Sequence, residues 1–290
     1  IYFHVIKTHR NILMRMANKV ADTVGYESKS VKPLGGDMAM EIGDSNMDAS
    51  RIGLGCMRMA DLSVSEVSKL INVALDNGVT LFDHADIYGA GRSEEVFGQA
   101  LAQNKGMRER MRIQTKCGIR DGYYDFSRAH ILSSVDDSLR RLQTEFIDLL
   151  LLHRPDALMN IEEVADTLHH LYRTGKVKRF GVSNFNAGQI ELLQSVCKVP
   201  IQVNQMQFGL MHAGMIRQGI ENNMLTDGAI DRDGATLTYC QLHNITIQAW
   251  SPLQYGFFEG NFVDNEKFPE VNAVLERIAG EHGVTKSAIA

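Results

Sequence analysis

The stretch VTLFDHADIYGAGRSEEVFGQALAQ (residues 79–103) decides the fold, because it holds one complete strand–turn–helix unit. Its first five residues are mostly apolar, as in a short buried strand, and residues 93–103 read as a helix with Ser93 as its N-cap. One polar residue at the end of a strand could be a capping group, whereas four indicate a site. The four that lie here are Asp83, His84, Asp86 and Tyr88.

The same alternation of a short apolar run and a longer segment recurs seven times after residue 50. The runs are mostly apolar on both faces, which is typical of buried parallel strands. The predicted strands are residues 52–56, 79–83, 111–118, 146–153, 178–184, 200–205 and 245–253. The first predicted helix is capped at Ser63 or Ser65 and ends at Gly78. The other predicted helices are residues 93–103, 127–143, 161–175, 186–196 and 267–283. A less regular stretch to about residue 235 follows the sixth strand.

Repeated strand–helix units form either an open doubly wound sheet or a closed (βα)8 TIM barrel, both of class α/β. The first strand runs into GLGCMRM with no GxGxxG, so the glycine fingerprint of an open dinucleotide-binding sheet is absent. The C-terminal ends of parallel barrel strands share one face, where side chains from separate strands converge. Polar or aromatic residues mark six of these ends, which favours the barrel: Asp83, Lys116, His153, Asn184, Gln205, and Trp250 with Ser251.

The two ends of the sequence do not fit the repeat. No eighth strand–helix unit follows the helix at 267–283, so we expect that unit to be missing, which would leave two bare sheet edges. Residues 1–37 match no unit, and their first twenty residues carry basic but no acidic side chains. They lack the serine richness of a transit peptide, and we expect an N-terminal extension of unknown role before a barrel domain at 38–290.

Composition excludes several classes of function. A net charge of −5 gives no attraction to nucleic acid or to an anionic membrane, and no apolar run approaches the length of a membrane span. The cysteines form no CxxC pair, which argues against a metal site or a disulfide framework and favours a reducing, cytoplasmic compartment. The four are Cys56, Cys117, Cys197 and Cys240.

The strand-end residues have a definite chemistry. Asp83 and Lys116, brought together at a barrel mouth, would form a partly buried ion pair, and an adjacent Tyr88 would have its phenol pKa lowered by the ammonium. Such a phenol is a proton donor, and His153 could orient or polarise an incoming carbonyl group. The set contains no protein nucleophile. Each residue alone would more often be structural, and only their joint occurrence at successive strand ends indicates a site.

Seven sequence blocks resemble, in order and spacing, the aldo-keto reductase superfamily over residues 40–290, and within it the bacterial YdhF-like oxidoreductase branch. They are GLGCMRM, FDHADIYGAGRSEEVFG, TKCG, LLLHRPD, GVSNF, NQ and AWSPL. The resemblance implies that Tyr88 is the general acid, that Lys116 lowers its pKa, that Asp83 holds Lys116 and that His153 orients the substrate. It also implies that MEIGDSNMDASRI (residues 40–52) is a short N-terminal β-hairpin that plugs the barrel bottom.

The same resemblance implies a nicotinamide cofactor as the hydride source. NADPH is expected from the family alone, with NADH also possible, because the family's contacts to the 2′-phosphate lie mostly after the eighth strand. The residues that match cofactor-binding positions are Ser183, Asn184 and Gln205 for the carboxamide, Trp250 for stacking on the ring, and Ser251 and Leu253 for the loop that passes the pyrophosphate.

The function expected is therefore NAD(P)H-dependent reduction of an aldehyde or ketone, with a small-molecule carbonyl substrate. Two alternatives stay open: a cofactor-binding regulatory subunit without turnover, and a lyase or isomerase that uses Lys116 as a Schiff base. His84 stands where many relatives carry Thr, and we expect it to be a hydrogen-bonded structural histidine.

Overall fold

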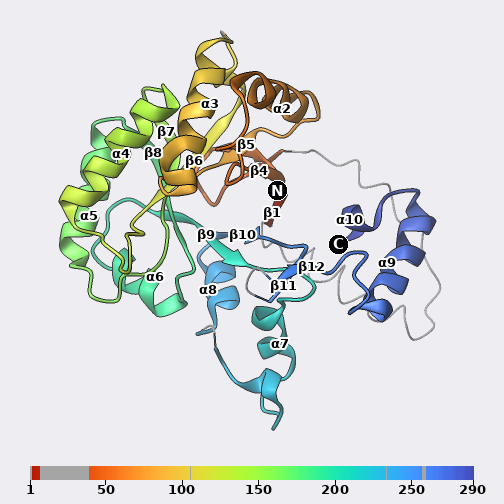
Figure 1. Ribbon diagram of the computed structural model, residues 1–290. Coiled ribbons are helices and arrows are strands. Elements are labelled where there is room, and N and C mark those ends of the chain that lie inside the picture. Colours follow the sequence, from red (N-terminus) through yellow and green to blue (C-terminus); the bar gives the residue numbers. More distant parts are fainter. Residues whose placement is uncertain (1, 7–38, 105, 233, 257–258) are drawn as a thin grey trace.

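The computed structural model describes residues 2–6, 39–104, 106–232, 234–256 and 259–290. Their strands close into an eight-stranded barrel in the order β1-β10-β9-β8-β7-β6-β5-β4 (Figure 1). Neighbours from β4 to β10 pair in parallel, as the buried apolar runs predict. The seven parallel strands are β4 (Ile52–Gly55), β5 (Leu81–Asp83), β6 (Arg112–Cys117), β7 (Ile147–Leu152), β8 (Val177–Ser183), β9 (Ile201–Gln207) and β10 (Thr246–Trp250).

The eighth place in the barrel is taken by β1 (Tyr2–Ile6), which runs antiparallel to both of its neighbours. His4 pairs with Ala249 of β10 and with Ile52 of β4. The expectation of two bare edges is therefore wrong, because a strand from the start of the chain pairs with both. The remainder of the predicted extension 1–37 lies outside the described residues.

No further barrel strand follows β10 within residues 251–256 and 259–290, in agreement with the prediction that the eighth strand–helix unit is missing. A small two-stranded sheet and a pair of helices stand there instead. These elements are β11 (Gln254–Tyr255), β12 (Gly260–Asn261), α9 (Pro269–His282) and α10 (Lys286–Ile289).

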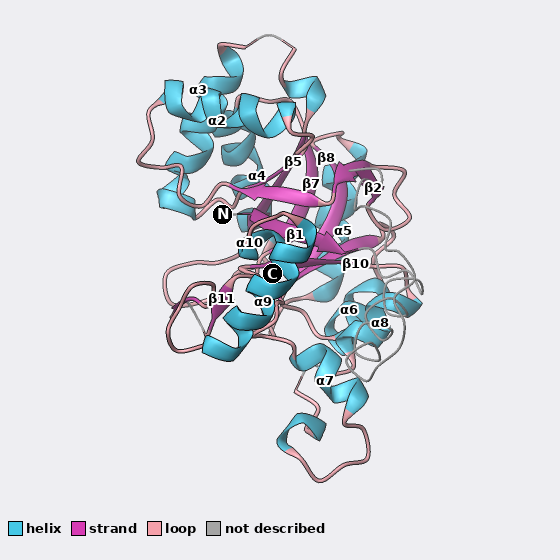
Figure 2. Ribbon diagram, turned by 90° about the vertical axis from the view of Figure 1, so that its right-hand side faces the viewer, coloured by secondary structure: helices cyan, strands magenta, loops and turns pink. Residues whose placement is uncertain are grey.

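Helices cover the outside of the barrel, while α7 extends away from it (Figures 1 and 2). Ser63 caps the first of them in a capping box with Glu66, and Ser127 caps α4, as predicted. Ser93 is not an N-cap: α3 begins one residue earlier, after Gly91 in a left-handed conformation (φ 91°). The helices are α2 (Val64–Asp76), α3 (Arg92–Ala102), α4 (Arg128–Leu142), α5 (Ile161–Arg173), α6 (Ala187–Gln194), α7 (Gly214–Ile220) and α8 (Thr236–Leu242), with short 3-10 turns at Tyr88–Gly91, Arg108–Arg110 and Asp227–Ala229.

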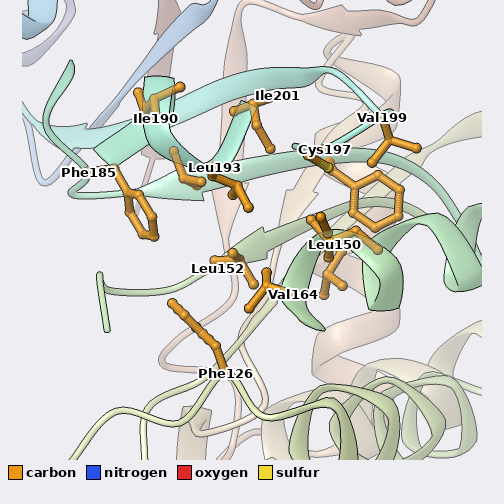
Figure 3. Close-up of a cluster of buried hydrophobic side chains, with 14 of the residues drawn as sticks. Phe126, Leu150, Leu152, Val164, Phe185, Ile190, Leu193, Cys197, Val199 and Ile201 are labelled. Carbon is orange, nitrogen blue, oxygen red and sulfur yellow. The ribbon is translucent and has the colours of Figure 1, made fainter. Parts of the chain in front are cut away.

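Two apolar clusters join the outer face of the strands to the helices, and they leave the inner face free for other chemistry. One packs β4–β6 against α2 and α3, with Phe82 and Phe97 fully buried. The other packs β6–β10 against α4–α6 and α8, and Figure 3 shows its side chains gathered between strands and helices. The residues labelled there are Phe126, Leu150, Leu152, Val164, Phe185, Ile190, Leu193, Cys197, Val199 and Ile201.

The predicted hairpin is present at the base of the barrel. Strands β2 (Ala39–Glu41) and β3 (Asp48–Ser50) pair antiparallel, and their apolar side chains pack inside the barrel. The turn between them is fixed by hydrogen bonds from Gly43 N to Thr246 Oγ1 (2.8 Å) and from Asp44 N to Gln202 Oε1 (2.8 Å). The interior cluster consists of Met40, Ile42, Met47, Ala49, Leu81, Leu149, Leu151 and Val203.

None of the helices formed by the described residues has the length and apolar character needed to cross a bilayer.

Candidate active site

Asp83, Lys116 and Tyr88 meet at the C-terminal end of β5 and β6. Asp83 Oδ2 lies 2.7 Å from Lys116 Nζ, which also donates to Tyr88 Oη (3.1 Å) and to the backbone carbonyl of His84 (2.7 Å). The ammonium thus has an acceptor for each of its three hydrogens. Lys116 is fully buried, so this charge is neutralised by fixed protein groups and not by water.

The turn after β5 sets the place of Tyr88. Gly89 and Gly91 adopt left-handed conformations with φ of 57° and 91°. A Cβ on Gly89 would lie 2.4 Å from Ala60 Cβ, so this turn tolerates no side chain at that position. The two glycines of the motif therefore permit the tight turn that joins Tyr88 to α3.

Lys116 and Tyr88 hold their protons at neutral pH. Burial lowers the pKa of Lys116, but attraction to Asp83 and Tyr88, with hydrogen bonds to both, outweighs it and the net pKa lies above the ordinary 10.5. Burial raises the pKa of Tyr88 above 10.0 although Lys116 acts in the opposite direction. Lys116 therefore acts on this pKa in the predicted direction, but the expectation that the phenol pKa lies below its ordinary value is wrong, because desolvation of the phenolate is the larger effect.

His153 follows β7 and faces the Tyr88 ring edge-on, with ring centroids 6.2 Å apart. Burial, then the charges of Lys116 and Arg154, hold its pKa well below 6.5, so the imidazole is neutral. Its Nδ1 is buried and has no hydrogen-bond partner within the part of the chain that the structure describes. A neutral ring with an unused polar atom beside a phenol is suited to contact a polar ligand.

His84 has a different environment from the one expected. Its ring is fully buried, packs edge-on against Phe97 at 4.5 Å, and burial lowers its pKa to about 3. Neither ring nitrogen finds a partner among the described residues, so the expectation of a hydrogen-bonded histidine is wrong. The strand alternation explains this: His84 points outward toward α3, whereas Asp83 points into the barrel.

Four of the predicted cofactor residues form one connected group. Asn184, in a left-handed conformation (φ 61°), donates to Ser183 Oγ (2.8 Å) and accepts from Trp250 Nε1 (3.2 Å). Ser183 Oγ in turn donates to the carbonyl of Gln205 (2.9 Å). The structure thus brings these side chains together on the mouth of the barrel, at the ends of β8, β9 and β10.

The two residues predicted to line the pyrophosphate lie in the loop after β10. Ser251 is half-buried with a positive φ of 49°. Leu253 is also half-buried and packs against the apolar cluster of Phe262, Val263 and Leu275 near α9. Ser251 therefore continues the group at the mouth, whereas Leu253 lies at its border with the C-terminal helices.

Gln205 links the cofactor group to the charged group, because its Nε2 donates to Asp83 Oδ1 (3.2 Å). Two further glutamines complete this link, and sequence reasoning missed both of them as site residues. Gln114 and Gln248 are fully buried and bond to each other and to Asp83 or Gln205. The signal was present: each stands two residues before a predicted site residue on the same strand, so it shares the inward face.

A second buried polar group supports the turn from outside. Glu94, on α3, accepts from Thr115 Oγ1 (2.6 Å) and from Arg141 Nε (2.8 Å) and is fully buried. Asp86 lies nearby, and burial followed by repulsion from Glu94 raises its pKa to about 7. No local pattern indicates this group, because Glu94 reads as an ordinary first-turn acid of a helix.

The chain resembles known proteins in both sequence and structure. The sequence model of the Aldo/keto reductase family matches residues 51–290. The chain is 39% identical over 251 residues to the uncharacterized oxidoreductase YcsN of Bacillus subtilis, covering 82% of this chain and 77% of that protein. It is 42% identical over 219 residues to the oxidoreductase YdhF of Escherichia coli, covering 71% of this chain and 67% of that protein.

Among solved structures, the thermostable aldo-keto reductase Tm1743, crystallised with the inhibitor epalrestat, superposes with a TM-score of 0.67. It is 28% identical, and the match covers 87% of this chain and 83% of that one.

Proposed function

Since the chain belongs to the aldo/keto reductase family, we propose that it reduces an aldehyde or ketone to an alcohol with a hydride from NADPH and a proton from Tyr88. NADH is the alternative hydride donor, and a reducing compartment such as the cytoplasm is the proposed location. The observation that carries the proposal is the contact of Tyr88 Oη with Lys116 Nζ at 3.1 Å, with Asp83 on the other side of the ammonium.

Tyr88 is the proposed proton donor. Its pKa above 10.0 keeps the phenol protonated at neutral pH, so the proton is available when a carbonyl oxygen gains charge. Lys116, fixed at its hydroxyl, stabilises the phenolate left behind, and Asp83 keeps that ammonium in place. Neutral His153 can donate one N–H to the same carbonyl oxygen and so orient the substrate beside Tyr88.

The residues at the mouth fit a nicotinamide. A carboxamide needs both donors and acceptors, and Asn184 with Ser183 and Gln205 supplies both kinds of atom. Trp250 offers a half-buried aromatic ring beside them, with Ser251 and Leu253 further along the loop for the pyrophosphate. When bound, the nicotinamide supplies the hydride. The choice of NADPH over NADH rests on the family alone.

Lys116 is poorly suited to the alternative of Schiff-base chemistry. A nucleophilic lysine needs a free amine and hence a lowered pKa, whereas the pKa of Lys116 is raised and its three hydrogens are committed to Asp83, Tyr88 and the His84 carbonyl. Trapping of a substrate on Lys116 by borohydride would favour that alternative.

The test of the proposal is Tyr88→Phe, compared with Tyr172→Phe on the exposed face of α5. We expect kcat for a panel of aldehydes and ketones to fall by about 10²–10⁴-fold in the first variant and to stay unchanged in the control. Binding of NADPH and NADH is followed by quenching of Trp250, the single tryptophan, and should be the same in all three proteins.

Two results would count against the proposal. Full turnover by Tyr88→Phe would exclude Tyr88 as the general acid. Absence of Trp250 quenching by either nucleotide would exclude the nicotinamide site.

A further inference from the structure

A closed network of buried amides surrounds Asp83 inside the barrel. Asp83 Oδ1 accepts from Gln114 Nε2 (2.5 Å) and from Gln205 Nε2 (3.2 Å). Both of these amide nitrogens also donate to Gln248 Oε1, at 2.9 and 3.0 Å, and Gln248 Nε2 donates back to Gln114 Oε1 (2.9 Å). All four side chains are buried, and they come from β5, β6, β9 and β10.

The direction of every bond in this network is fixed by Asp83. An ionised carboxylate only accepts, so Gln114 and Gln205 must turn their NH2 groups toward it. Their second hydrogens then require an acceptor, which places the oxygen of Gln248 between them and its NH2 toward Gln114. If one amide were reversed, an NH2 group would face another NH2 group, or an oxygen would face another oxygen. The network therefore has a single arrangement of donors and acceptors.

Burial of these three amides is unfavourable unless their hydrogen bonds stabilise the Asp83 carboxylate. Burying three glutamine side chains costs free energy that aliphatic residues would not, and the inward positions of β7 are occupied by Leu149 and Leu151. Asp83 explains the difference, because Lys116 satisfies only Oδ2 and a buried carboxylate needs donors at both oxygens.

We propose that Gln114 and Gln248 are positioning residues, which act through Asp83 to hold Lys116 against the Tyr88 hydroxyl. The inference rests on the proposed function, in which that contact carries the proton transfer. With Oδ1 held by two amides the carboxylate cannot rotate, and Oδ2 keeps Lys116 Nζ at 2.7 Å and within 3.1 Å of Tyr88 Oη. Neither glutamine bonds to Tyr88, His153 or Asn184 in the described structure, whereas Gln248 also accepts from Gln205.

The first experiment is Gln248→Met, a change of similar volume that removes the amide, with Gln114→Met as a second variant on another strand. The matched control is Gln202→Met, which removes a buried amide at the base of the barrel, where Gln202 bonds to the hairpin at Asp44 N. We expect kcat to fall by about 10–100-fold in the first two variants, because a misplacement of about 1 Å has an effect of this size. The Kd for NADPH should be unchanged in Gln114→Met, because Gln114 bonds only to Asp83 and Gln248, whereas Gln248 also holds the proposed cofactor residue Gln205. The control should keep its kcat.

A double-mutant cycle separates positioning through Asp83 from a general loss of packing. In an Asp83→Asn background the carboxylate is already gone, so Gln248→Met should cause no further loss of kcat. A loss of the same factor in both backgrounds, or a wild-type kcat in both single glutamine variants, would overturn the proposal.

A titration that needs no turnover makes the test independent of the reaction. In protein labelled with ¹³C-tyrosine, the resonance assigned by its absence in Tyr88→Phe reports the ionisation of a phenol that faces Lys116, Asp83, Cys56 and His153. Because Lys116 favours the phenolate, loosening it should move the Tyr88 midpoint to higher pH in Gln248→Met and leave it unmoved in Gln202→Met. An unmoved midpoint in Gln248→Met would contradict the inference, whereas absence of carbonyl reduction by the wild type would contradict only the proposed function.

Discussion

The two ends of the barrel interior share strands β5 and β9 and carry opposite chemistry. At the base, Leu81, Leu149, Leu151 and Val203 pack against the β2–β3 hairpin in an apolar cluster. At the mouth, only two residues further along β5, Asp83 begins the buried network of charges and amides. Along β5 and β9 one backbone serves both ends, so the chemistry of each end depends on the side chains that its strands turn inward.

The difference between the layers is also one of tolerance. Apolar contacts at the base are non-directional, so residues of similar volume can replace one another at modest cost. The mouth depends on donors and acceptors in fixed directions, where the loss of one partner leaves another buried and unsatisfied. Substitutions that change side-chain size by the same amount should therefore differ between the two ends in their effect on stability and on kcat.

The largest effect is expected for Asp83→Asn. It leaves the buried ammonium of Lys116 without its counter-charge, which should lower the free energy of unfolding by about 3–5 kcal/mol and also lower kcat. Urea denaturation and steady-state kinetics measure the two effects. A variant with wild-type stability and kcat would show that the mouth is as tolerant as the base.

A somewhat smaller effect, on stability alone, is expected for Leu149→Ala at the base. The buried leucine leaves a cavity, which should cost about 3 kcal/mol in urea denaturation. Leu149 has Gln114 as its register partner but is not itself one of the reacting groups, so kcat and KM per folded molecule should stay close to those of the wild type. A selective loss of kcat would mean that the two layers are coupled.

The smallest effect is expected for Asp86→Asn, beside the mouth, and it should depend on pH. Asp86 has a pKa of about 7 in the folded protein against an ordinary 3.8, so the unfolded chain releases the proton first as pH rises. The carboxyl thus destabilises the fold progressively from about pH 4 to pH 7. The variant should match the wild type near pH 4 and exceed it at pH 8 by about 2 kcal/mol, discounted for partial exposure.

The same pH series on Leu149→Ala sharpens the contrast between the layers. The leucine carries no titratable group, so its loss of stability should be the same at pH 4 and pH 8. A stabilisation by Asp86→Asn that is equal at both pH values would show that the carboxyl does not titrate in this range.

Local patterns predict most of this fold. Strand period and caps such as Ser63, Ser127 and Gly283 are properties of a few neighbouring residues, and the helices begin or end there as expected. The place of β1 was not predictable in this way, because its pairing of His4 with Ala249 joins residues from opposite ends of the sequence and runs against the parallel repeat.

In the candidate site too, features set by neighbouring residues were predictable and features set by long-range packing were not. Strand alternation predicts that Asp83 and Lys116 face inward, and the structure brings them together. The pKa of Tyr88 could not be predicted, since it depends on whether burial or the nearby ammonium is the larger influence, and sequence gives no burial depth. The outward direction of His84 followed from the alternation, but its lack of a partner depends on the packing of α3.

The hairpin at the base also bears on the order of folding. Gly43, Asp44 and Ser45 hydrogen-bond to Thr246, Gln202 and Arg179, which are 203, 158 and 134 residues away in the sequence. Contacts of such separation carry a large loop-closure entropy, so the hairpin can form early but cannot dock until the later strands have assembled. Substitutions in its turn should therefore raise the unfolding rate and leave the folding rate almost unchanged. The hairpin would then be the last part of the barrel to dock during folding and the first to detach during unfolding.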